Sequence, residues 1–433
     1  MKKYLPLLSF LLWFTPRTVA ETELAVPAEL RARTEKPAIE YRVGEPIRFT
    51  LELLSQDGTA VDGNLRVQWS CRGDDGQNLQ GECRVSELPA TIETSLSKAG
   101  FVWLSAKLLD EAGEAVKTPR GNRTIAVEFN GGAGAEILRI EAVPEPADFD
   151  AFWQRRKQEL AAVPMEVLER KLVKNIDNCD IYAVKVACAG PRPVTGYLTI
   201  PHGAAPKSLP ARAEYFGYSW RRIPVPAANA DRIVFWMSAH GAELDREPEY
   251  YDRFFEELKS NGYTQGFDPA DNRDPEHSFF AGMAMRVLRS LEFLKSLPEW
   301  DGRTLEVNGG SQGGLQSVWG AALDHDVTRA NAWIIWCCDL GGTAEFGRVS
   351  GPWRVPYVPE LGYFDAANHA KRIAENCFVD IHTAGLGDYI SPPSGLAIFF
   401  RNLKCPARIQ YLQGAGHTYR PALGGMESFT LSK

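Results

Sequence analysis

Residues 304–323 read TLEVNGGSQGGLQSVWGAAL, and this stretch decides the fold. Its apolar spacing predicts a short strand over residues 304–308 and a helix over residues 314–323. Ser311 lies between them, with glycines two positions before and two after that let strand and helix pass close together. This context is typical of a nucleophile elbow, a tight turn that projects a serine hydroxyl into solvent. We therefore predict Ser311 as a nucleophile; the alternative is a glycine-rich turn with an incidental serine.

The chain around this turn alternates strand-like and helix-like segments from Cys179 onward. Further strands are expected at residues 181–186, 194–200, 212–215, 233–237, 332–338, 378–384 and 408–412, and helices at residues 149–162, 250–260 and 277–297. This alternation predicts an α/β fold, with a mostly parallel sheet covered by helices on both faces.

A serine hydroxyl is a weak nucleophile until a base takes its proton. In the architecture that carries such an elbow, an acid and then a histidine follow the serine along the chain. Asp388 comes just after the strand at 378–384, and His417 lies in a glycine-rich loop after the last strand. Because ligands bind at the carboxyl ends of parallel strands, we predict Asp388 as the acid and His417 as the base. Asp365 is the rival for the acid.

An oxyanion hole needs two backbone N–H donors that point at the developing negative charge. The residue after the nucleophile, Gln312, is expected to supply one. Tyr218, in a loop after an early strand, is expected to supply the other, with Gly217 allowing close approach. Tyr218 and Trp220 are also predicted to line the substrate pocket; the alternative is that both aromatic side chains belong to the core.

Other titratable residues carry weaker signals. His240 also follows a strand but precedes the nucleophile, so we interpret it as pocket wall or structural. Asp324-His325-Asp326 resembles a metal cluster, yet it ends a helix and is expected to be solvated. No CxxC or CxxH spacing indicates zinc, so the sequence predicts neither a metal nor a cofactor. Cys71 and Cys83 could close a hairpin, and the pairing of the other six cysteines stays open.

Residues 25–130 alternate apolar and polar side chains, which predicts a small antiparallel β-sandwich. Trp69 and Trp103 occupy alternating strand positions, so core packing is favoured over a role as sugar platforms. Residues 130–135 read NGGAGA, which predicts a flexible stretch and a domain boundary. The expected domains are therefore a β-sandwich at residues 21–135 and a catalytic domain at residues 136–433.

The amino-terminal residues 1–20 have the layout of a secretory signal peptide. A basic start precedes an apolar stretch, and small residues end at Ala20. The mature protein is therefore expected in the periplasm or outside the cell. The 433-residue chain has 48 Lys and Arg against 55 Asp and Glu, a net charge of −7, which argues against nucleic acid as a partner. No apolar run approaches the roughly 18 residues of a membrane-spanning helix, so no integral span is predicted.

Several segments together resemble the acetyl xylan esterase / cephalosporin C deacetylase family, carbohydrate esterase family seven. The resemblance covers about residues 140–425. It is carried by GGSQGG at 309–314, FDAFW at 149–153, PVTGYL at 193–198, YFGY at 215–218, GMAMRVLRSL at 282–291, Asp388 with PPS at 392–394, and Gly416-His417.

The resemblance implies an α/β-hydrolase that uses no metal and removes acetyl groups from sugars such as xylan or xylo-oligosaccharides. It implies Ser311 as nucleophile, Asp388 as acid and His417 as base, with Tyr218 and Gln312 as the oxyanion hole. The chain departs from typical members in its leading β-domain and its signal peptide. It also has Phe216 where the family often has histidine.

The sequence therefore leaves three hypotheses about function. The first is a secreted carbohydrate acetyl esterase, with a homo-oligomer left open. The second is an exported peptidase or another short-chain ester hydrolase of the same fold. The third is a noncatalytic, glycan-binding envelope protein.

Overall fold

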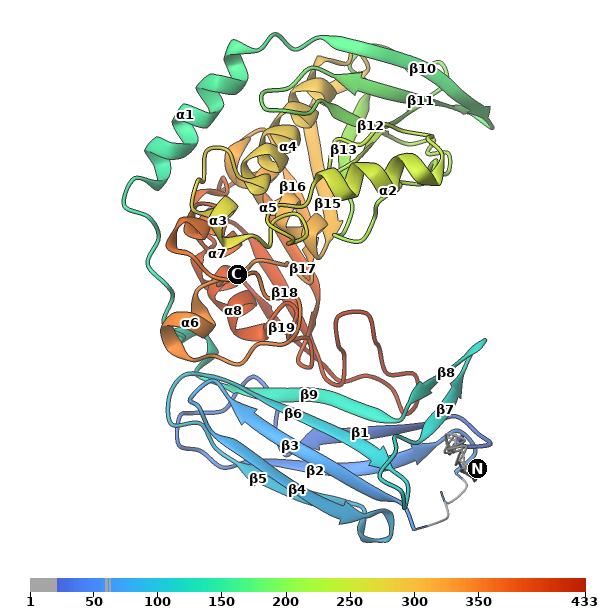
Figure 1. The fold of residues 1–433 in the computed structure, drawn as a ribbon, viewed down its shortest axis with the longest axis vertical. Helices are drawn as coiled ribbons and strands as arrows, with labels where there is room; N and C mark the ends of the chain where they lie inside the picture. The colour runs from blue at the N-terminus through green and yellow to red at the C-terminus, as the bar shows by residue number, and fades with distance from the viewer. Residues whose placement is uncertain (1–21, 59–60, 62–63) are drawn as a thin grey trace, which may run out of the picture.

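The computed structural model describes residues 22–58, 61 and 64–433. The predicted signal peptide lies outside these residues. The described chain forms an all-β part followed by an α/β part (Figure 1). Within the described ranges, no helix combines the length and the apolar character needed to cross a membrane.

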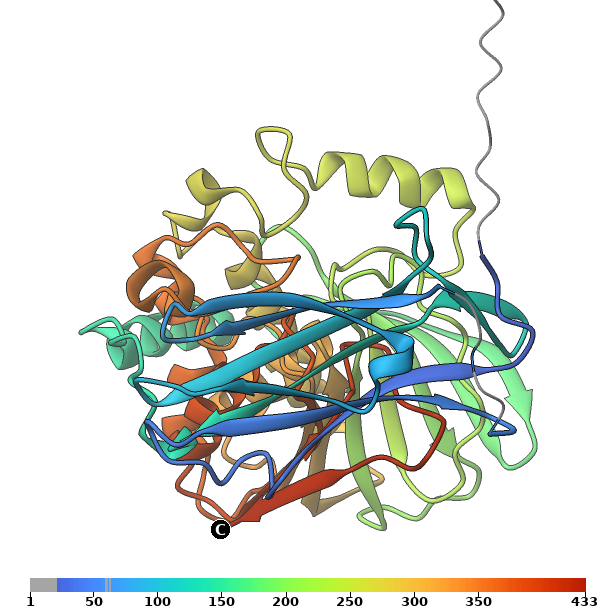
Figure 2. The same ribbon diagram turned by 90° about the horizontal axis from the view of Figure 1, so that it is seen from below.

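The first part is a small sandwich of antiparallel sheets, as the alternating apolar side chains predict (Figure 2). One sheet has the order β1-β2-β5 and the other the order β4-β3-β6-β9, with the hairpin β7–β8 beside them. The strands are β1 (Ala28–Thr34), β2 (Ile47–Ser55), β3 (Arg66–Gly73), β4 (Asn78–Arg84), β5 (Ala90–Thr94), β6 (Gly100–Leu109), β7 (Lys117–Arg120), β8 (Arg123–Ala126) and β9 (Glu128–Ala135). Side chains from both sheets, such as Phe49 and Leu104, share one buried core.

The prediction of a flexible stretch at residues 130–135 is wrong, because these residues belong to strand β9. β9 pairs along its length with β6, and most of its residues are buried. A Cβ on Gly132 would lie 2.1 Å from the carbonyl oxygen of Val102. The glycines here therefore reflect close packing between neighbouring segments.

The second part is built on one ten-stranded sheet, ordered β10-β11-β12-β14-β13-β15-β16-β17-β18-β19. Its strands are β10 (Val167–Ile176), β11 (Cys179–Val186), β12 (Val194–Pro201), β13 (Leu209–Tyr215), β14 (Ile233–Met237), β15 (Trp300–Gly310), β16 (Arg329–Trp333), β17 (Phe378–Gly385), β18 (Ala407–Leu412) and β19 (Ser428–Ser432). The strands from β14 to β18 run parallel, and the outer ones pair antiparallel. The architecture is thus an α/β fold preceded by a small β-domain, as predicted.

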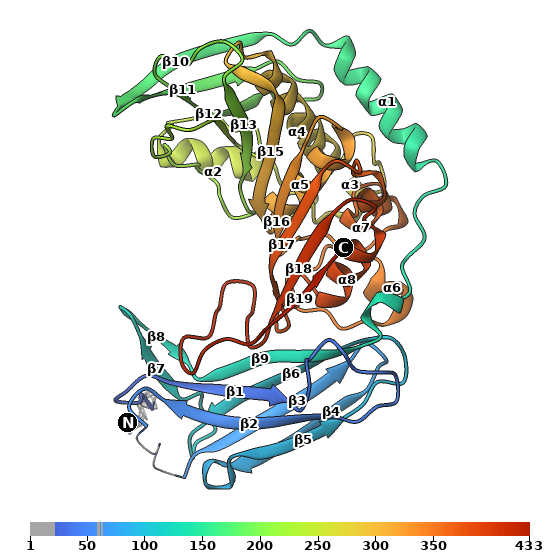
Figure 3. The ribbon, with the colours of Figure 1, turned by 180° about the vertical axis from the view of Figure 1, so that it is seen from behind.

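The helices that pack on the central strands lie on one face of the sheet (Figures 1 and 3). They are α4 (Phe279–Ser296), α5 (Gln312–Leu323) and α8 (Pro393–Asn402). The other helices are α1 (Phe149–Ala162), α2 (Pro248–Glu257), α3 (Pro269–Asn272), α6 (Gly342–Phe346) and α7 (Ala366–His369). The main helix, α4, begins where the Ser278 side chain accepts a hydrogen bond from the N–H of Ala281. α4 contacts α5, α5 contacts α7, and α7 contacts α8, which makes a single helical layer.

The prediction that helices cover both faces is therefore wrong. On the face away from the helices, the central strands carry ion pairs. Arg212 and Arg232 both contact the carboxylate of Glu306, and Arg408 contacts that of Asp380. These charged residues alternate with buried apolar ones such as Val307. Among the described residues, no helix packs on these strands from that side (Figure 3), so this polar face of the sheet is not covered by a helical layer.

The strand predicted over residues 332–338 is also misplaced. β16 ends at Trp333, and the chain then turns sharply, with positive φ at Ile334, Cys337 and Asp339. The apolar residues after Trp333 therefore form a buried turn and not a continuing strand. The turn brings this segment beside the carboxyl end of β15, where Ser311 lies.

Candidate active site

The predicted elbow is present at the carboxyl end of β15. β15 ends at Gly310, α5 begins at Gln312, and Ser311 between them has φ 58° and ψ −121°. Such a conformation is strained for a residue with a side chain and is characteristic of functional turns. A Cβ on Gly313 would lie 2.2 Å from the carbonyl oxygen of Tyr215. Only glycine lets α5 come this close to β13.

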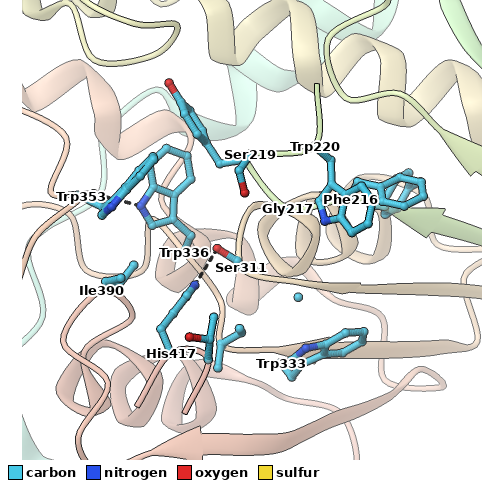
Figure 4. A pocket seen from close by; sticks show the side chains of 15 residues that line it. Phe216, Gly217, Ser219, Trp220, Ser311, Trp333, Trp336, Trp353, Ile390 and His417 are labelled. Atoms are coloured by element: carbon cyan, nitrogen blue, oxygen red, sulfur yellow. Dashed lines mark hydrogen bonds between the residues drawn. The ribbon is translucent and has the colours of Figure 1, made fainter. Parts of the chain in front are cut away.

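Ser311, His417 and Asp388 come together although they are far apart in the sequence. The Nε2 atom of His417 lies 3.0 Å from the Oγ of Ser311, and Figure 4 shows this contact. The Nδ1 atom of the same ring lies 2.8 Å from Oδ2 of Asp388. With Nδ1 protonated and donating to Asp388, Nε2 is free to accept the serine proton. This is the order of contacts found in a serine–histidine–aspartate triad.

The loop after β17 fixes the second oxygen of Asp388. Its Oδ1 atom accepts hydrogen bonds from the N–H groups of Ile390 and Ser391, each at 3.0 Å. Asp388 is 1% exposed, and these two backbone donors orient its carboxylate toward His417. The rival, Asp365, instead caps α7 by accepting from the N–H of Ala367, and it faces no histidine in the described hydrogen bonds.

The two residues predicted for the oxyanion hole also flank Ser311. Gln312 is the first residue of α5, where helical N–H groups have no partner inside the helix. Tyr218 and Gly217 line the same pocket as Ser311, and a Cβ on Gly217 would lie 3.9 Å from the Cβ of Ser311. The Tyr218 hydroxyl donates to the carbonyl oxygen of Gln265, and burial raises its pKa to about 12. Tyr218 is therefore fixed beside the nucleophile as a neutral phenol.

A pocket of about 540 Å³ opens over Ser311 and His417. Its walls are aromatic on both sides of the serine (Figure 4), with Trp336 and Trp353 on one side and Phe216, Trp220 and Trp333 on the other. Its polar lining includes Ser219, Ser311, His417 and Thr418.

Sequence analysis predicted Trp220 in this pocket but missed Trp333, Trp336 and Trp353. Trp333 ends a parallel strand, which was a usable signal because ligands bind at that edge. Trp353 is half exposed and has φ 64°, and its carbonyl oxygen accepts from the indole N–H of Trp336 at 3.1 Å. No local pattern places Trp353 here, because it lies in a long loop after α6.

The weaker candidates have structural surroundings. His240 is fully buried and packs against Phe255, with ring centroids 4.8 Å apart, and burial lowers its pKa to about 3. Asp324 and Asp326 both pair with Lys295; Asp326 is exposed, as expected for a solvated helix end, whereas the side chain of Asp324 is mostly buried. In the part of the chain that the structure describes, no group of three or more His, Cys, Asp or Glu side chains could hold a metal ion.

All eight cysteines are free thiols. Cys71 pairs with Leu79 in the β3–β4 ladder, whereas Cys83 pairs with Val67. The hairpin register therefore separates Cys71 from Cys83, and the suggested disulfide between them is absent.

Residues 140–354 match the family described as acetyl xylan esterase (AXE1). The chain is also 32% identical over 293 residues to the acetyl esterase Axe7A of Xylanibacter ruminicola. That similarity covers 64% of this chain and 64% of the relative, so the chain matches just under two thirds of that protein's length.

Two solved structures share the fold. The acetyl xylan esterase from Paenibacillus sp. R4 superposes with a TM-score of 0.54 at 24% identity, over 66% of this chain and 94% of that one. Acetyl xylan esterase 1 from Thermoanaerobacterium sp. JW/SL YS485 also has a TM-score of 0.54, at 20% identity, over 67% of this chain and 94% of its own. Both likenesses show the α/β-hydrolase fold of the second part.

Proposed function

We propose that the protein is a serine esterase that removes acetyl groups from acetylated carbohydrates, because residues 140–354 match the acetyl xylan esterase family and the chain resembles an acetyl esterase. The observation that carries the proposal is the pair of contacts made by one imidazole. His417 lies 3.0 Å from the hydroxyl of Ser311 and 2.8 Å from the carboxylate of Asp388.

The proposed reaction runs through an acetyl-enzyme. His417 takes the proton of Ser311 while Oγ attacks the acetyl carbonyl carbon, and the carbonyl oxygen becomes an oxyanion. The N–H groups of Gln312 and Tyr218 stabilise that charge. The carbon–oxygen bond to the sugar then breaks, and His417 returns the proton to the leaving alcohol. Water, deprotonated by His417, attacks the acetyl-enzyme and releases acetate and free Ser311.

The pocket supports a sugar as the alcohol side of the ester. The flat faces of pyranose rings carry C–H groups that pack on aromatic side chains, and Trp220 and Trp353 present half-exposed rings at the mouth. Binding pockets commonly combine such apolar walls with a few polar groups that fix orientation. Ser219 and Thr418 are the polar side chains available here beside the triad. Acetylated xylan or xylo-oligosaccharides are the substrates we propose.

The proposal includes export, which rests on the sequence of residues 1–20. Their basic start, apolar stretch and small residues before Ala20 fit a secretory signal. Expression of the whole chain with its signal, followed by amino-terminal sequencing of the exported product, tests this part. A mature chain that starts at Glu21 is expected.

The test of the activity compares the purified protein with its Ser311→Ala variant. Both are assayed on acetylated xylo-oligosaccharides, 4-nitrophenyl acetate and 4-nitrophenyl octanoate, with Ser296→Ala at the end of α4 as the control. We expect acetate release from the oligosaccharides by the parent and by Ser296→Ala, and its loss in Ser311→Ala.

The three substrates separate the alternatives. Turnover of the short aryl ester alone would retain the triad and move the substrate to other small esters. No serine-dependent turnover of any of the three would contradict the esterase and favour the peptidase or the glycan-binding protein.

A further inference from the structure

The β-sandwich packs directly against the two loops that carry Asp388 and His417. We define the histidine loop as residues 413–427, between β18 and β19, and the acid loop as residues 386–392, between β17 and α8. In Figures 1 and 3 the histidine loop extends from the end of β18 onto β9 and toward the hairpin β7–β8. Both loops make specific contacts there.

The histidine loop is rich in glycine. It contains four glycines, of which Gly414, Gly424 and Gly425 have positive φ. Inside the loop, the N–H of Gly416 donates to the carbonyl oxygen of Tyr419, and the Arg420 guanidinium donates to the carbonyl oxygens of Gly416 and Tyr419. Glycine-rich segments lose much conformational entropy when they are ordered, so contacts from outside the loop add to these internal bonds in fixing it.

The start of the histidine loop is anchored on β9. The side-chain amide of Gln413 pairs with the backbone of Gly132, accepting from its N–H at 3.0 Å and donating to its carbonyl oxygen at 2.9 Å. Gln413 is 4% exposed, so these hydrogen bonds are protected from water. Gly132 belongs to the β-sandwich, and Gln413 lies four residues before His417.

The end of the histidine loop is anchored on Glu29 of β1. The Glu29 carboxylate accepts from the N–H of Ala422 at 2.9 Å, from the N–H of Leu423 at 2.9 Å and from the hydroxyl of Tyr419 at 3.1 Å. Glu29 is buried, and only about 20 Å³ of space remains in the groove that it shares with the loop. A buried carboxylate that accepts several N–H bonds makes a strong, oriented contact.

Arg120 of β7 completes this anchor. Its guanidinium donates to Glu29 at 2.8 Å and to the carbonyl oxygen of Arg420, and it lies over the ring of Tyr419 at 4.7 Å. Glu29 and Arg120 therefore bind the segment 419–423, which lies two to six residues after His417.

The acid loop rests on the same part of the sandwich. The ring of Tyr389, the residue after Asp388, stacks on Trp103 of β6 with centroids 4.3 Å apart and planes inclined by 14°. A Cβ on Gly387, the residue before Asp388, would lie 2.0 Å from the carbonyl oxygen of Asn130. Trp103 thus packs against the catalytic loops, which refines the prediction that it belongs to the core of its own domain.

We propose that the β-sandwich is a positioning element of the active site, and that Glu29 and Arg120 hold His417 in reach of Ser311. This inference rests on the proposed triad. Glu29 and Arg120 touch neither the substrate pocket nor the three triad side chains in the described contacts, so they act through the loop. A displacement of about 1 Å of a catalytic group can cost a hundredfold in rate, so loosening these anchors should lower turnover in a folded protein.

The test uses Glu29→Ala and Arg120→Met in the full chain. The matched controls are Glu93→Ala, whose carboxylate pairs with Arg48 at the surface of the same sandwich, and Arg123→Met, which faces Arg120 across the hairpin. Hydrolysis of 4-nitrophenyl acetate is measured well below the unfolding midpoint of each variant. Proton NMR follows the far-downfield resonance of the Nδ1–H of His417, assigned by its absence in His417→Ala.

The expected result is that kcat falls about tenfold or more in both variants while KM stays within about twofold, because binding is untouched and geometry is lost. The downfield resonance is expected to broaden or vanish in both variants and to remain in both controls. If Glu29 and Arg120 only stabilised the fold, the variants would have a lower unfolding midpoint, but kcat and the downfield resonance of the folded protein would not change.

Folded Glu29→Ala and Arg120→Met proteins with parental kcat and a sharp resonance would overturn the inference. If Glu29→Ala does not fold, Arg120→Met decides whether the anchor orients His417, because the Arg120 side chain is only partly buried. If the parent protein hydrolyses no ester, the proposed function fails, and the resonance alone still decides whether the sandwich orients His417.

Discussion

The carboxylate of Asp388 approaches His417 from the side opposite Ser311, with 2.8 Å between Oδ2 and Nδ1. This contact selects the tautomer in which Nε2 accepts the serine proton. Asp388→Asn would place an amide there and favour the other tautomer. We expect kcat on 4-nitrophenyl acetate to fall about 10⁴-fold with little change in the unfolding midpoint. Asp326→Asn, at an exposed helix end, is the control, and a loss smaller than tenfold in Asp388→Asn would refute the role.

The close approach of α5 to β13 makes a steric prediction for Gly313. Because a Cβ there would lie 2.2 Å from the carbonyl oxygen of Tyr215, Gly313→Ala must push Ser311 and the Tyr215–Tyr218 loop apart. Esterase activity should fall by about a hundredfold or more. In Gly282→Ala, on α4, the new Cβ would meet its nearest neighbour at 3.5 Å, and the helix should gain about 0.5–1 kcal/mol of stability. Equal activities in the two variants would contradict this account of the elbow.

The aromatic walls of the pocket predict that loss of a tryptophan will affect a sugar ester more than a small aryl ester. Trp353→Ala should raise KM for acetylated xylo-oligosaccharides about tenfold, because it removes a half-exposed ring at the mouth. The rate on 4-nitrophenyl acetate should change little, since the acetyl group reacts at Ser311. Leu172→Ala removes an equally exposed apolar side chain from β10 and serves as the control. A parallel loss on both substrates would show that Trp353 supports the triad instead of the sugar.

Two buried histidines predict that the protein loses stability in acid. Burial lowers the pKa of both His240 and His369 to about 3, against about 6.5 in an unfolded chain. Below pH 6.5 the unfolded chain therefore binds protons that the folded protein does not. The free energy of unfolding should fall as the pH drops from about 6.5 to about 3, by up to about 1.4 kcal/mol per pH unit for each histidine.

Chemical denaturation at pH 7.5, 6 and 5 measures this dependence. His240→Leu removes one of the two buried histidines. The slope of the unfolding free energy against pH should therefore fall by up to about 1.4 kcal/mol per pH unit, whatever the effect on absolute stability. An unchanged slope in that variant would mean that His240 takes up a proton in the folded state.

The central site was predictable because its signals are local. Ser311 stands in a glycine pattern between strand and helix, and Asp388 and His417 each follow a strand in the expected order. The rings that complete the pocket were less accessible to sequence reasoning. Trp353 depends on the course of a long loop, and its contact with Trp336 joins segments separated by α6.

Two features of the fold depart from prediction because apolar residues alone do not determine them. Residues 332–338 are apolar throughout, yet they contain the positive-φ positions Ile334 and Cys337, which no strand accommodates. Conversely, the alternation of Leu305 and Val307 with Glu306 and Asn308 already indicated a sheet with one polar face. The apolar positions predict a face covered by helices, and the polar positions predict a face without them.

The bonds between Glu29 and the chain at Ala422 and Leu423 join residues 393 and 394 positions apart. A ribosome makes β1 early, but these bonds can form only after residue 423 has been added. The anchor of His417 therefore forms only after the sandwich and the strands up to β18 have been synthesised. If the sandwich orients this histidine, a nascent chain would remain unable to hydrolyse esters until residue 423 had been translated and had left the ribosome.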